Sequence, residues 1–293
     1  MYYCSELAAV IARHCDQQGV NETAIEGLRL YFSRTDMPRT PVVYEPSICI
    51  VAQGKKQIHF GDYSRSYDPD NYLINSLTMP IEAEVMGACE ERPYVGMSLR
   101  VDRTIVSQLM MEMDKIDGGS EVEEVREIIS STPLSERLQQ NLLKLLDTLE
   151  QPMDRQILSP SLQREIFYEV LKGPQGPLLR NSVLNHAGAN RIAPVVHYIE
   201  EHFHQPLDIE QISRFAGMSS SSLHEHFKQV TSMSPMQFVK SLRLHSARTL
   251  LLNGNQASEA SYRVGYSSPS QFSREFKRFF GDTPRDVQAA AAR

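Results

Sequence analysis

The chain has 293 residues, of which 41% are hydrophobic and 23% are charged, and its formal net charge is −6. These values are typical of a globular protein that is long enough for two domains, each with its own core. The apolar run Leu7–Ala12 is followed at once by Arg13 and His14. It is too short for a signal peptide or a membrane span, so we expect a cytoplasmic protein with no membrane partner.

The charge is divided unevenly along the chain. Residues 1–185 contain 18 Lys and Arg against 27 Asp and Glu, whereas residues 186–293 contain 12 against 9. The second part also holds seven of the nine histidines. An acidic sensor joined to a DNA-binding domain would show this asymmetry, although the basic excess is small.

The four cysteines are scattered and form no CxxC pair: they are Cys4, Cys15, Cys49 and Cys89. A structural zinc site needs clustered ligands, so we expect no metal and reduced, mostly buried thiols. Cys49 lies in an apolar run. Cys89 lies beside Glu90, Glu91 and Arg92, and it is the better candidate for a sensor thiol.

Residues 5–18 are predicted to form a short helix, and the texture then changes to β between Ile25 and about Val101. Turn signals such as Gly61-Asp62 and Asp68-Pro69 separate short apolar or alternating segments, without crossover helices. The main predicted strands are Leu28–Phe32, Pro41–Tyr44, Ile48–Val51, Gln57–Phe60, Tyr72–Leu77, Ile81–Met86 and Val95–Val101. This pattern predicts an antiparallel sandwich or small barrel.

Beyond Asp102 the sequence is helical. Candidate helices are Thr104–Met113, Glu121–Ser130, Leu134–Leu149 and Ser161–Leu171. The third carries an apolar stripe of Leu138, Leu142, Leu145 and Leu149. This stripe either packs on the barrel or forms the seam of a two-fold dimer, which is the hypothesis we take forward. Gly173–Pro177 then interrupts the helices as a hinge or a rigid corner.

One pattern occurs twice between Ala193 and Arg285. The first copy contains Ala216-Gly217-Met218-Ser219, Leu223, Phe227-Lys228 and Ser234-Pro235, and the second contains Val264-Gly265-Tyr266-Ser267, Phe272, Phe276-Lys277 and Thr283-Pro284. Each copy predicts a helix, a Gly-containing turn and a second helix, which is the layout of a helix-turn-helix unit. A long helix from Pro235 to about Leu252 would join the two units.

Helical periodicity divides each second helix into two faces. Leu223 and Phe227 in the first, and Phe272 and Phe276 in the second, must face the core. The residues opposite them are Ser221, His224, Glu225 and Lys228 in the first unit, and Ser270, Gln271, Arg274, Lys277 and Arg278 in the second. Arg can pair with guanine and Gln with adenine, so the second face has the side chains for reading bases. The first face could equally be an ordinary solvated surface.

Residues 193–290 resemble the DNA-binding domain of the AraC/XylS family of bacterial transcription regulators. The resemblance is carried by the repeated motifs above and by Arg243-Leu244 and Ala247-Arg248 in the joining helix. It implies that both units enter promoter DNA, with RNA polymerase as a further partner and the nucleoid as the location when bound. Family base-contact positions fall on Ser221, Ser222, His224 and Glu225, where the family often has aromatic residues or Arg.

The N-terminal part resembles the cupin-like sensory half of one branch of this family, through Val43–Ser47, Val51–Gly54 and Tyr67–Pro69. The expected fold class is therefore an α+β multidomain protein with an N-terminal antiparallel, cupin-like β-barrel and a C-terminal all-α domain. The expected divisions are a sensory domain over residues 1–113, a helical connector with the dimerisation region over 114–188, and a DNA-binding domain over 189–293.

The leading hypothesis is a homodimeric one-component regulator, an activator without a cofactor, whose small-molecule effector binds in the barrel. The candidate effector-binding residues are Tyr44, His59, Met79, Tyr94 and Met97. One alternative is a cupin enzyme fused to a DNA-binding tail. His59 is the only histidine between His14 and His186, so a His-rich metal site cannot form and we expect no enzyme. Further alternatives are a redox or electrophile sensor acting through Cys89, and an architectural DNA binder, which the long acidic half disfavours.

Overall fold

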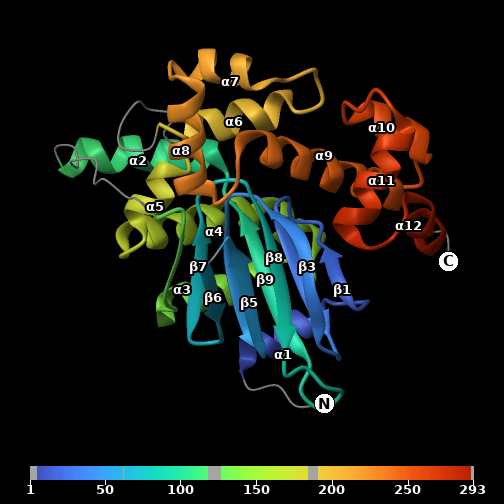
Figure 1. The fold of residues 1–293 in the computed structure, drawn as a ribbon. Helices are drawn as coiled ribbons and strands as arrows, with labels where there is room; N and C mark the ends of the chain where they lie inside the picture. The colour runs from blue at the N-terminus through green and yellow to red at the C-terminus, as the bar shows by residue number, and fades with distance from the viewer. Residues whose placement is uncertain (1–4, 62, 118–126, 184–190, 292–293) are drawn as a thin grey trace.

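The computed structural model describes residues 5–61, 63–117, 127–183 and 191–291. Two β-sheets make up the body of the N-terminal part, and helices α6 to α12 lie across one end of these sheets (Figure 1). No helix in the described ranges is both long enough and apolar enough to cross a membrane.

All the strand pairs are antiparallel. The six-stranded sheet has the order β1-β2-β9-β4-β7-β10, and its strands are β1 (Gly19–Glu22), β2 (Leu28–Ser33), β9 (Tyr94–Arg100), β4 (Ser47–Gln53), β7 (Asn71–Asn75) and β10 (Ile129–Pro133). The four-stranded sheet has the order β3-β8-β5-β6, and its strands are β3 (Met37–Tyr44), β8 (Met79–Met86), β5 (Lys55–Phe60) and β6 (Tyr63–Tyr67). The expected antiparallel fold is confirmed, as two facing sheets.

Both faces of the six-stranded sheet are buried, so its central strands are apolar along most of their length. Alternate residues such as Leu30, Ile50 and Met97 belong to a core shared with the helices on one side. Their neighbours, such as Cys49 and Tyr94, belong to a second core that includes residues of the four-stranded sheet. The sheet therefore separates a helix-facing core from an inter-sheet core.

Five helices accompany the sheets: α1 (Glu6–Arg13), α2 (Arg103–Asp117), α3 (Glu136–Asp147), α4 (Pro152–Lys172) and α5 (Gly176–Asn181). The expected helix over Glu121–Ser130 is wrong where it can be checked, since Ile129 begins β10; residues 121–126 lie outside the described residues. β10 pairs with β7, which would otherwise end the sheet with unpaired backbone groups.

The leucine stripe of α3 lies in the helix-facing core. Leu142 and Leu145 are fully buried and Leu138 is 2% exposed, while Leu149 is partly buried against the same core. Helix α3 packs on α4 and α1 of the same chain. The hypothesis that this stripe is a dimer seam is therefore wrong, because its apolar area is already buried within one chain.

The segment Gly173–Pro177 is a tight corner. Gly173 is the C-cap of α4, and the backbone amide of Gly176 donates to the carbonyl oxygen of Gly173 at 3.0 Å. A Cβ at Gly176 would clash with the carbonyl oxygen of Leu171. Only glycine fits this close approach, so the segment is a corner in this structure.

The C-terminal part is all helical: α6 (Ala193–His202), α7 (Ile209–Ala216), α8 (Ser220–Thr231), α9 (Pro235–Leu252), α10 (Ala257–Arg263), α11 (Pro269–Phe280) and α12 (Pro284–Ala291). The side chains of α7 and α8 join the inter-sheet core through α6 and the first half of α9. Helices α10 to α12 form a separate core with the second half of α9. Two helical units thus share one long helix.

Because Leu142 is fully buried inside one chain, Leu142→Ala should lower the free energy of unfolding by about 2–5 kcal/mol. The cost is the lost apolar contact together with the cavity left behind. Urea unfolding followed by circular dichroism would measure it. Leu252→Ala, at a position that is 51% exposed, is the matched control and should change stability little. Equal stability of the two variants would contradict the placement of the stripe in the core.

Candidate nucleic-acid interface and the cluster between the sheets

The first helix-turn-helix unit consists of α7, a tight turn and α8. Helix α7 begins with a capping box in which the side chains of Asp208 and Gln211 each accept from the other's backbone amide. It ends at Gly217, whose φ of 61° is a left-handed conformation that favours glycine. Ser219 caps α8 by accepting from the amide of Ser222. Local sequence signals therefore set both the angle and the start of α8.

Helix α8 buries Leu223 and Phe227, and the ring of Phe227 packs edge-on against Phe238 of α9 at 5.4 Å. The opposite side chains are exposed: Ser221, His224, Glu225 and Lys228. Ser222 is half-buried, and its hydroxyl lies 3.1 Å from Nδ1 of His226. The face expected to meet DNA is thus solvent-accessible, except that Ser222 is engaged within its own helix.

The second unit consists of α10, a turn at Gly265 and α11. A Cβ at Gly265 would lie 2.8 Å from the carbonyl oxygen of His204, which is too close for any other residue. The φ of Gly265 is 92°, a second reason why this position favours glycine. Ser268 caps α11 by accepting from the amide of Gln271. Phe272 and Phe276 are fully buried beneath it. These contacts orient α11 in the same way as α8.

The outward face of α11 is basic and exposed, with Ser270, Gln271, Arg274, Lys277 and Arg278 on it. Within the described ranges no carboxylate forms an ion pair with any of these three cations. Gln271 donates to Glu275 at 3.2 Å and would have to release this bond to pair with a base. Charges that are not neutralised inside the protein are free to meet phosphates and base edges.

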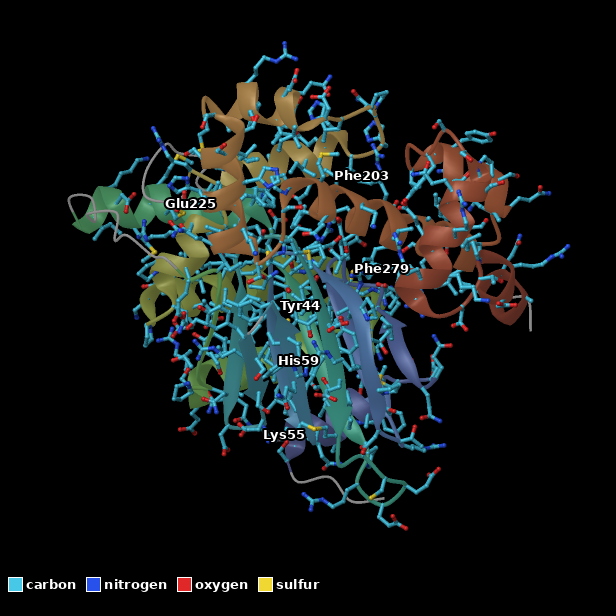
Figure 2. All side chains as sticks on the ribbon, viewed as in Figure 1. Tyr44, Lys55, His59, Phe203, Glu225 and Phe279 are labelled. Atoms are coloured by element: carbon cyan, nitrogen blue, oxygen red, sulfur yellow. The ribbon has the colours of Figure 1, made fainter. Side chains whose placement is uncertain are left out.

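Helices α8 and α11 lie toward opposite ends of α9 (Figure 2). Figure 2 labels Glu225 on α8 and Phe279 on α11, on either side of the joining helix. The face of α8 combines an acidic side chain, Glu225, with Lys228, whereas the face of α11 carries only positive charge. The second unit therefore has the stronger electrostatic attraction for DNA.

His245 of α9 is enclosed by the second unit. Its ring meets those of Phe279 and Phe280 edge-on at 5.4 and 5.2 Å. Its Nε2 atom is buried without a hydrogen-bond partner. Burial, followed by the charge of Arg248, lowers the pKa of His245 to about 4. His245 is therefore neutral near pH 7 and packs against the rings of Phe279 and Phe280.

The candidate effector residues do not all lie together. Tyr44 and Tyr94 belong to the inter-sheet core, as does Met79. Met97 belongs to the helix-facing core, because it lies an odd number of residues from Tyr94 on the same strand. His59 alternates with the inward-facing Ile58, and its Nε2 lies 2.7 Å from Glu84 Oε1, on the outer face of the four-stranded sheet (Figure 2). The expectation that Met97 and His59 point into the barrel is corrected.

Three side chains that the sequence analysis missed join Tyr44 and Tyr94 between the sheets. They are Tyr31, Lys56 and Tyr67. Lys56 lies beside the rings of Tyr31 and Tyr44, and the hydroxyls of Tyr44 and Tyr67 are 3.1 Å apart. The alternation of side chains along β5 could have placed Lys56 between the sheets, because Lys56 is two residues before the buried Ile58 and so lies on the same face of the strand. We name Tyr31, Tyr44, Lys56, Tyr67 and Tyr94 the inter-sheet cluster.

The cysteines occupy different environments. Cys49 is buried beside the inter-sheet cluster, where burial raises the pKa of its thiol. Burial also raises the pKa of Cys15 to about 12. Cys89 is exposed, and Cys4 lies outside the described residues. No group of three or more His, Cys, Asp or Glu suited to a metal ion occurs in the described ranges.

The two parts of the chain touch at defined points. A Cβ at Gly61, in the β5–β6 turn, would lie 2.5 Å from Cβ of Ser232, which is the C-cap of α8. Nη1 of Arg103, in α2, lies 3.3 Å from Nε2 of His197 in α6. Helices α9 and α11 also contact β3. The sheets are thus in direct contact with both helix-turn-helix units.

Comparisons with known proteins agree with this division. Residues 24–178 match the family described as the AraC-type transcriptional regulator N-terminus, and residues 212–290 match a helix-turn-helix domain family. The HTH-type transcriptional activator RhaS of Escherichia coli O1:K1 is 29% identical over 153 residues, which are 51% of this chain and 54% of that protein. RhaS of Citrobacter koseri is 30% identical over the same shares. The chain spans about half the length of these curated relatives.

Two solved structures have a similar overall fold. ToxT of Vibrio cholerae O395, bound to (E)-4-(8-methylnaphthalen-1-yl)but-3-enoic acid, has a TM-score of 0.64 at 10% identity and covers 91% of this chain and 100% of its own. Unsaturated fatty acid bound ToxT of strain SCE256 has a TM-score of 0.63 at 12% identity and covers 92% and 96%. At these identities the similarity concerns the fold alone.

The lowered pKa of His245 predicts a pH-dependent stability. The unfolded chain takes up this proton near pH 6.5 and the folded chain only near pH 4, so folding loses stability as the pH falls from 6.5 to 4. At pH 4.5 the loss should amount to about 2 kcal/mol relative to pH 7.5. Urea unfolding would be measured at both pH values. Between pH 7.5 and pH 4.5, the free energy of unfolding of His245→Leu should fall by about 2 kcal/mol less than that of the unmodified protein. An unchanged pH dependence in this variant would contradict the assignment.

Proposed function

The chain belongs to the AraC-type family of transcriptional regulators, and on that premise we propose that it is a one-component activator controlled by a small organic ligand. The observation that carries the DNA-binding part of this proposal is the exposed face of α11, with its three unpaired cations in the part of the chain that the structure describes. Activation is supported by the similarity to RhaS, whose name describes an activator.

We propose that α8 and α11 each enter the major groove of promoter DNA. The residues assigned to this contact are Ser221, Ser222, His224, Glu225, Lys228, Ser270, Gln271, Arg274, Lys277 and Arg278. Because α11 carries the unopposed positive charge, it supplies most of the affinity, and α8 adds weaker contacts through hydroxyl, imidazole and carboxylate groups. The DNA-binding domain is assigned to residues 189–293.

We assign the sensory role to residues 1–113, with the space between the two sheets as the ligand site. Tyr44, Met79 and Tyr94 are retained as ligand-binding candidates, since they lie in the inter-sheet core. ToxT, which has a similar fold, has been solved with organic acids bound. This supports the proposal that the N-terminal part of the chain responds to a ligand. The exposed thiol of Cys89 supports a second candidate signal, an oxidant or electrophile.

In this proposal the chain is a regulator and not an enzyme. The metal-dependent cupins that offer the alternative need a His-x-His pair, and His59 instead pairs with Glu84 on the outer face of its sheet. The proposed partners are double-stranded promoter DNA, RNA polymerase and a second copy of the chain. The proposed location is the bacterial cytoplasm, with nucleoid association when DNA is bound.

We propose homodimer formation through the connector, residues 114–188, but through a different surface from the leucine stripe. The first half of α4 exposes Met153, Ile157 and Leu158, at 70%, 62% and 48%. Ile157 is four residues after Met153 and lies on the same side of the helix, and Leu158 is next to Ile157. Exposed apolar side chains that lie close together often mark an interaction site, and a two-fold interface is the commonest kind between copies of one chain.

For DNA recognition, Arg274→Ala should weaken binding by about 1–3 kcal/mol and relax the preference at one base pair, as expected for the loss of a bidentate base contact. The operator would first be selected from random duplex DNA with the unmodified protein, and affinities would be measured by fluorescence anisotropy. Lys144→Ala, at an exposed position of α3, removes one positive charge far from this face and serves as the control. If Arg274→Ala binds the operator as tightly as the control, α11 does not face the DNA as proposed.

For the dimer, Ile157→Glu should convert the protein to a folded monomer in sedimentation velocity and should reduce its affinity for paired half-sites. The introduced charge would be buried in the apolar interface without a partner. Gln156→Glu adds the same charge at the neighbouring exposed position and should leave the dimer intact. A dimer that survives Ile157→Glu would show that this side of α4 is not the interface.

A further inference from the structure

The lysine of the inter-sheet cluster has no acidic partner. Nζ of Lys56 lies 5.2 Å from the ring centroid of Tyr31 and 5.0 Å from that of Tyr44. Two aromatic faces attract the ammonium group but do not neutralise its charge. Among the described residues no Asp or Glu forms an ion pair with it, and the buried thiol of Cys49 lies nearby. A partly buried cation that lies against aromatic rings is commonly paired with a carboxylate.

The hydroxyl groups around Lys56 have hydrogens that their mutual bonds do not use. The hydroxyls of Tyr31 and Ser98 lie 3.0 Å apart, and those of Tyr44 and Tyr67 lie 3.1 Å apart. Each pair has two hydroxyl hydrogens, and its mutual bond uses one of them. The remaining hydrogen of each pair is available, together with the three of the ammonium group. The cluster therefore offers several donors at one place, and no carboxylate among the described residues pairs with its ammonium group.

The phenols keep these hydrogens at neutral pH. Burial raises the pKa of Tyr31 to about 12 and raises the pKa values of Tyr44 and Tyr67 well above 10. The same burial lowers the pKa of Lys56, since its charge is desolvated without an opposite charge nearby. An anion placed beside Lys56 would reverse this effect, because it would stabilise the ammonium form.

The cluster also retains accessible surface. Tyr67 and Tyr94 are almost fully buried, at 2% and 3%, but Tyr31, Tyr44 and Lys56 are only partly buried. Gly96 contributes to the arrangement, since a Cβ there would stand 2.9 Å from the hydroxyl oxygen of Tyr94. The surrounding inter-sheet core is apolar: Val51, Ile58, Leu73, Met79, Ile81 and Val85. Donors gathered at one point within an apolar surround suit a ligand with one polar end.

We propose that the inter-sheet cluster binds the carboxylate group of a small organic acid, with Lys56 as its counterion and the hydroxyls of Tyr31, Tyr44 and Tyr67 as hydrogen-bond donors. This inference rests on the proposed regulatory function and names the chemical class of its ligand. A carboxylate accepts several hydrogen bonds at once and provides the negative charge that Lys56 lacks. The apolar remainder of the acid packs against the inter-sheet core.

The same strand leads from the cluster to the first helix-turn-helix unit. Lys56 lies in β5, which ends at Phe60, and the following Gly61 is the residue that abuts Ser232 at the end of α8. The apolar core between the sheets is also continuous with that of α7 and α8. A carboxylate that draws Lys56 toward it therefore acts on an element in contact with α8. This contact is how the bound acid changes the DNA affinity of the first unit.

The test compares Lys56→Met with Lys55→Met in the full-length protein. Lys56→Met keeps the length of the side chain and removes the ammonium group, and Lys55 is the exposed neighbour on the other face of β5. The probes are acetate, hexanoate, benzoate and 4-hydroxybenzoate, each paired with its neutral amide. Binding is measured by isothermal titration calorimetry, with the unmodified protein as reference.

At least one carboxylate should bind the unmodified protein and Lys55→Met equally, while its amide binds at least about tenfold more weakly. Lys56→Met should lose about tenfold or more in affinity for that acid, and Tyr67→Phe should lose several-fold. Three results would overturn the proposal: no acid binds, acid and amide bind alike, or Lys56→Met binds the acid as well as Lys55→Met does. Covalent capture of benzaldehyde at Lys56 upon borohydride reduction, without carboxylate binding, would also overturn it by showing a nucleophilic amine.

Operator binding separates this inference from the proposed function. Lys55→Met without added acid should bind the selected operator like the unmodified protein, because Lys55 lies outside both the DNA face and the inter-sheet cluster. If the operator is bound but no acid is, the ligand class is wrong and the regulatory function stands. If no operator can be selected with the unmodified protein, the regulatory function itself is wrong, whatever the calorimetry shows.

Discussion

Burial of both faces of the six-stranded sheet is the constraint on which the rest of the N-terminal structure depends. The buried residues of β2, β4 and β9 lie either against the helices or against the second sheet, and alternation decides which. Leu30, Ile50 and Met97 complete the apolar packing on the helix side. The polar side chains at intervening positions, such as Tyr31 and Ser98, are consequently confined between the sheets, where they must pair with one another or with a ligand.

The same requirement for burial orients the DNA-binding helices. Phe227 packs on Phe238 of α9, and Phe272 and Phe276 are fully buried under α11, so the opposite side of each helix remains in solvent. The two units differ in their surroundings, however. The core of the first is continuous with the inter-sheet core, whereas the second has a core of its own with α9, α10 and α12. A change between the sheets therefore reaches α8 more directly than α11, while α11 carries the stronger positive charge.

Much of the fold could be predicted because its signals are local. Ser219 and Ser268 as N-caps, Gly217 and Gly265 in the turns, and Pro235 at the start of α9 each act within a few residues, and the expected helices follow them closely. Helical periodicity likewise separated the outward residues of α8 and α11 from the buried ones. Strand β10 could not be predicted in this way, because it depends on the edge of β7, more than fifty residues earlier in the chain. Backbone pairing with a distant edge leaves no local trace.

The sequence by itself determined most of the order of elements, apart from strands such as β10, together with the duplicated helix-turn-helix pattern and the faces of its second helices. These arise from interactions between near neighbours. The tertiary structure decided where each apolar stripe and each inward-facing residue is buried. It placed Leu142 of α3 in the core of a single chain, turned Met97 away from Tyr94, and brought Lys56 to Tyr31 and Tyr44. The physical reason is that an amphipathic pattern specifies a buried face but not its partner. The partner depends on which distant surfaces meet when the sheets and helices pack together.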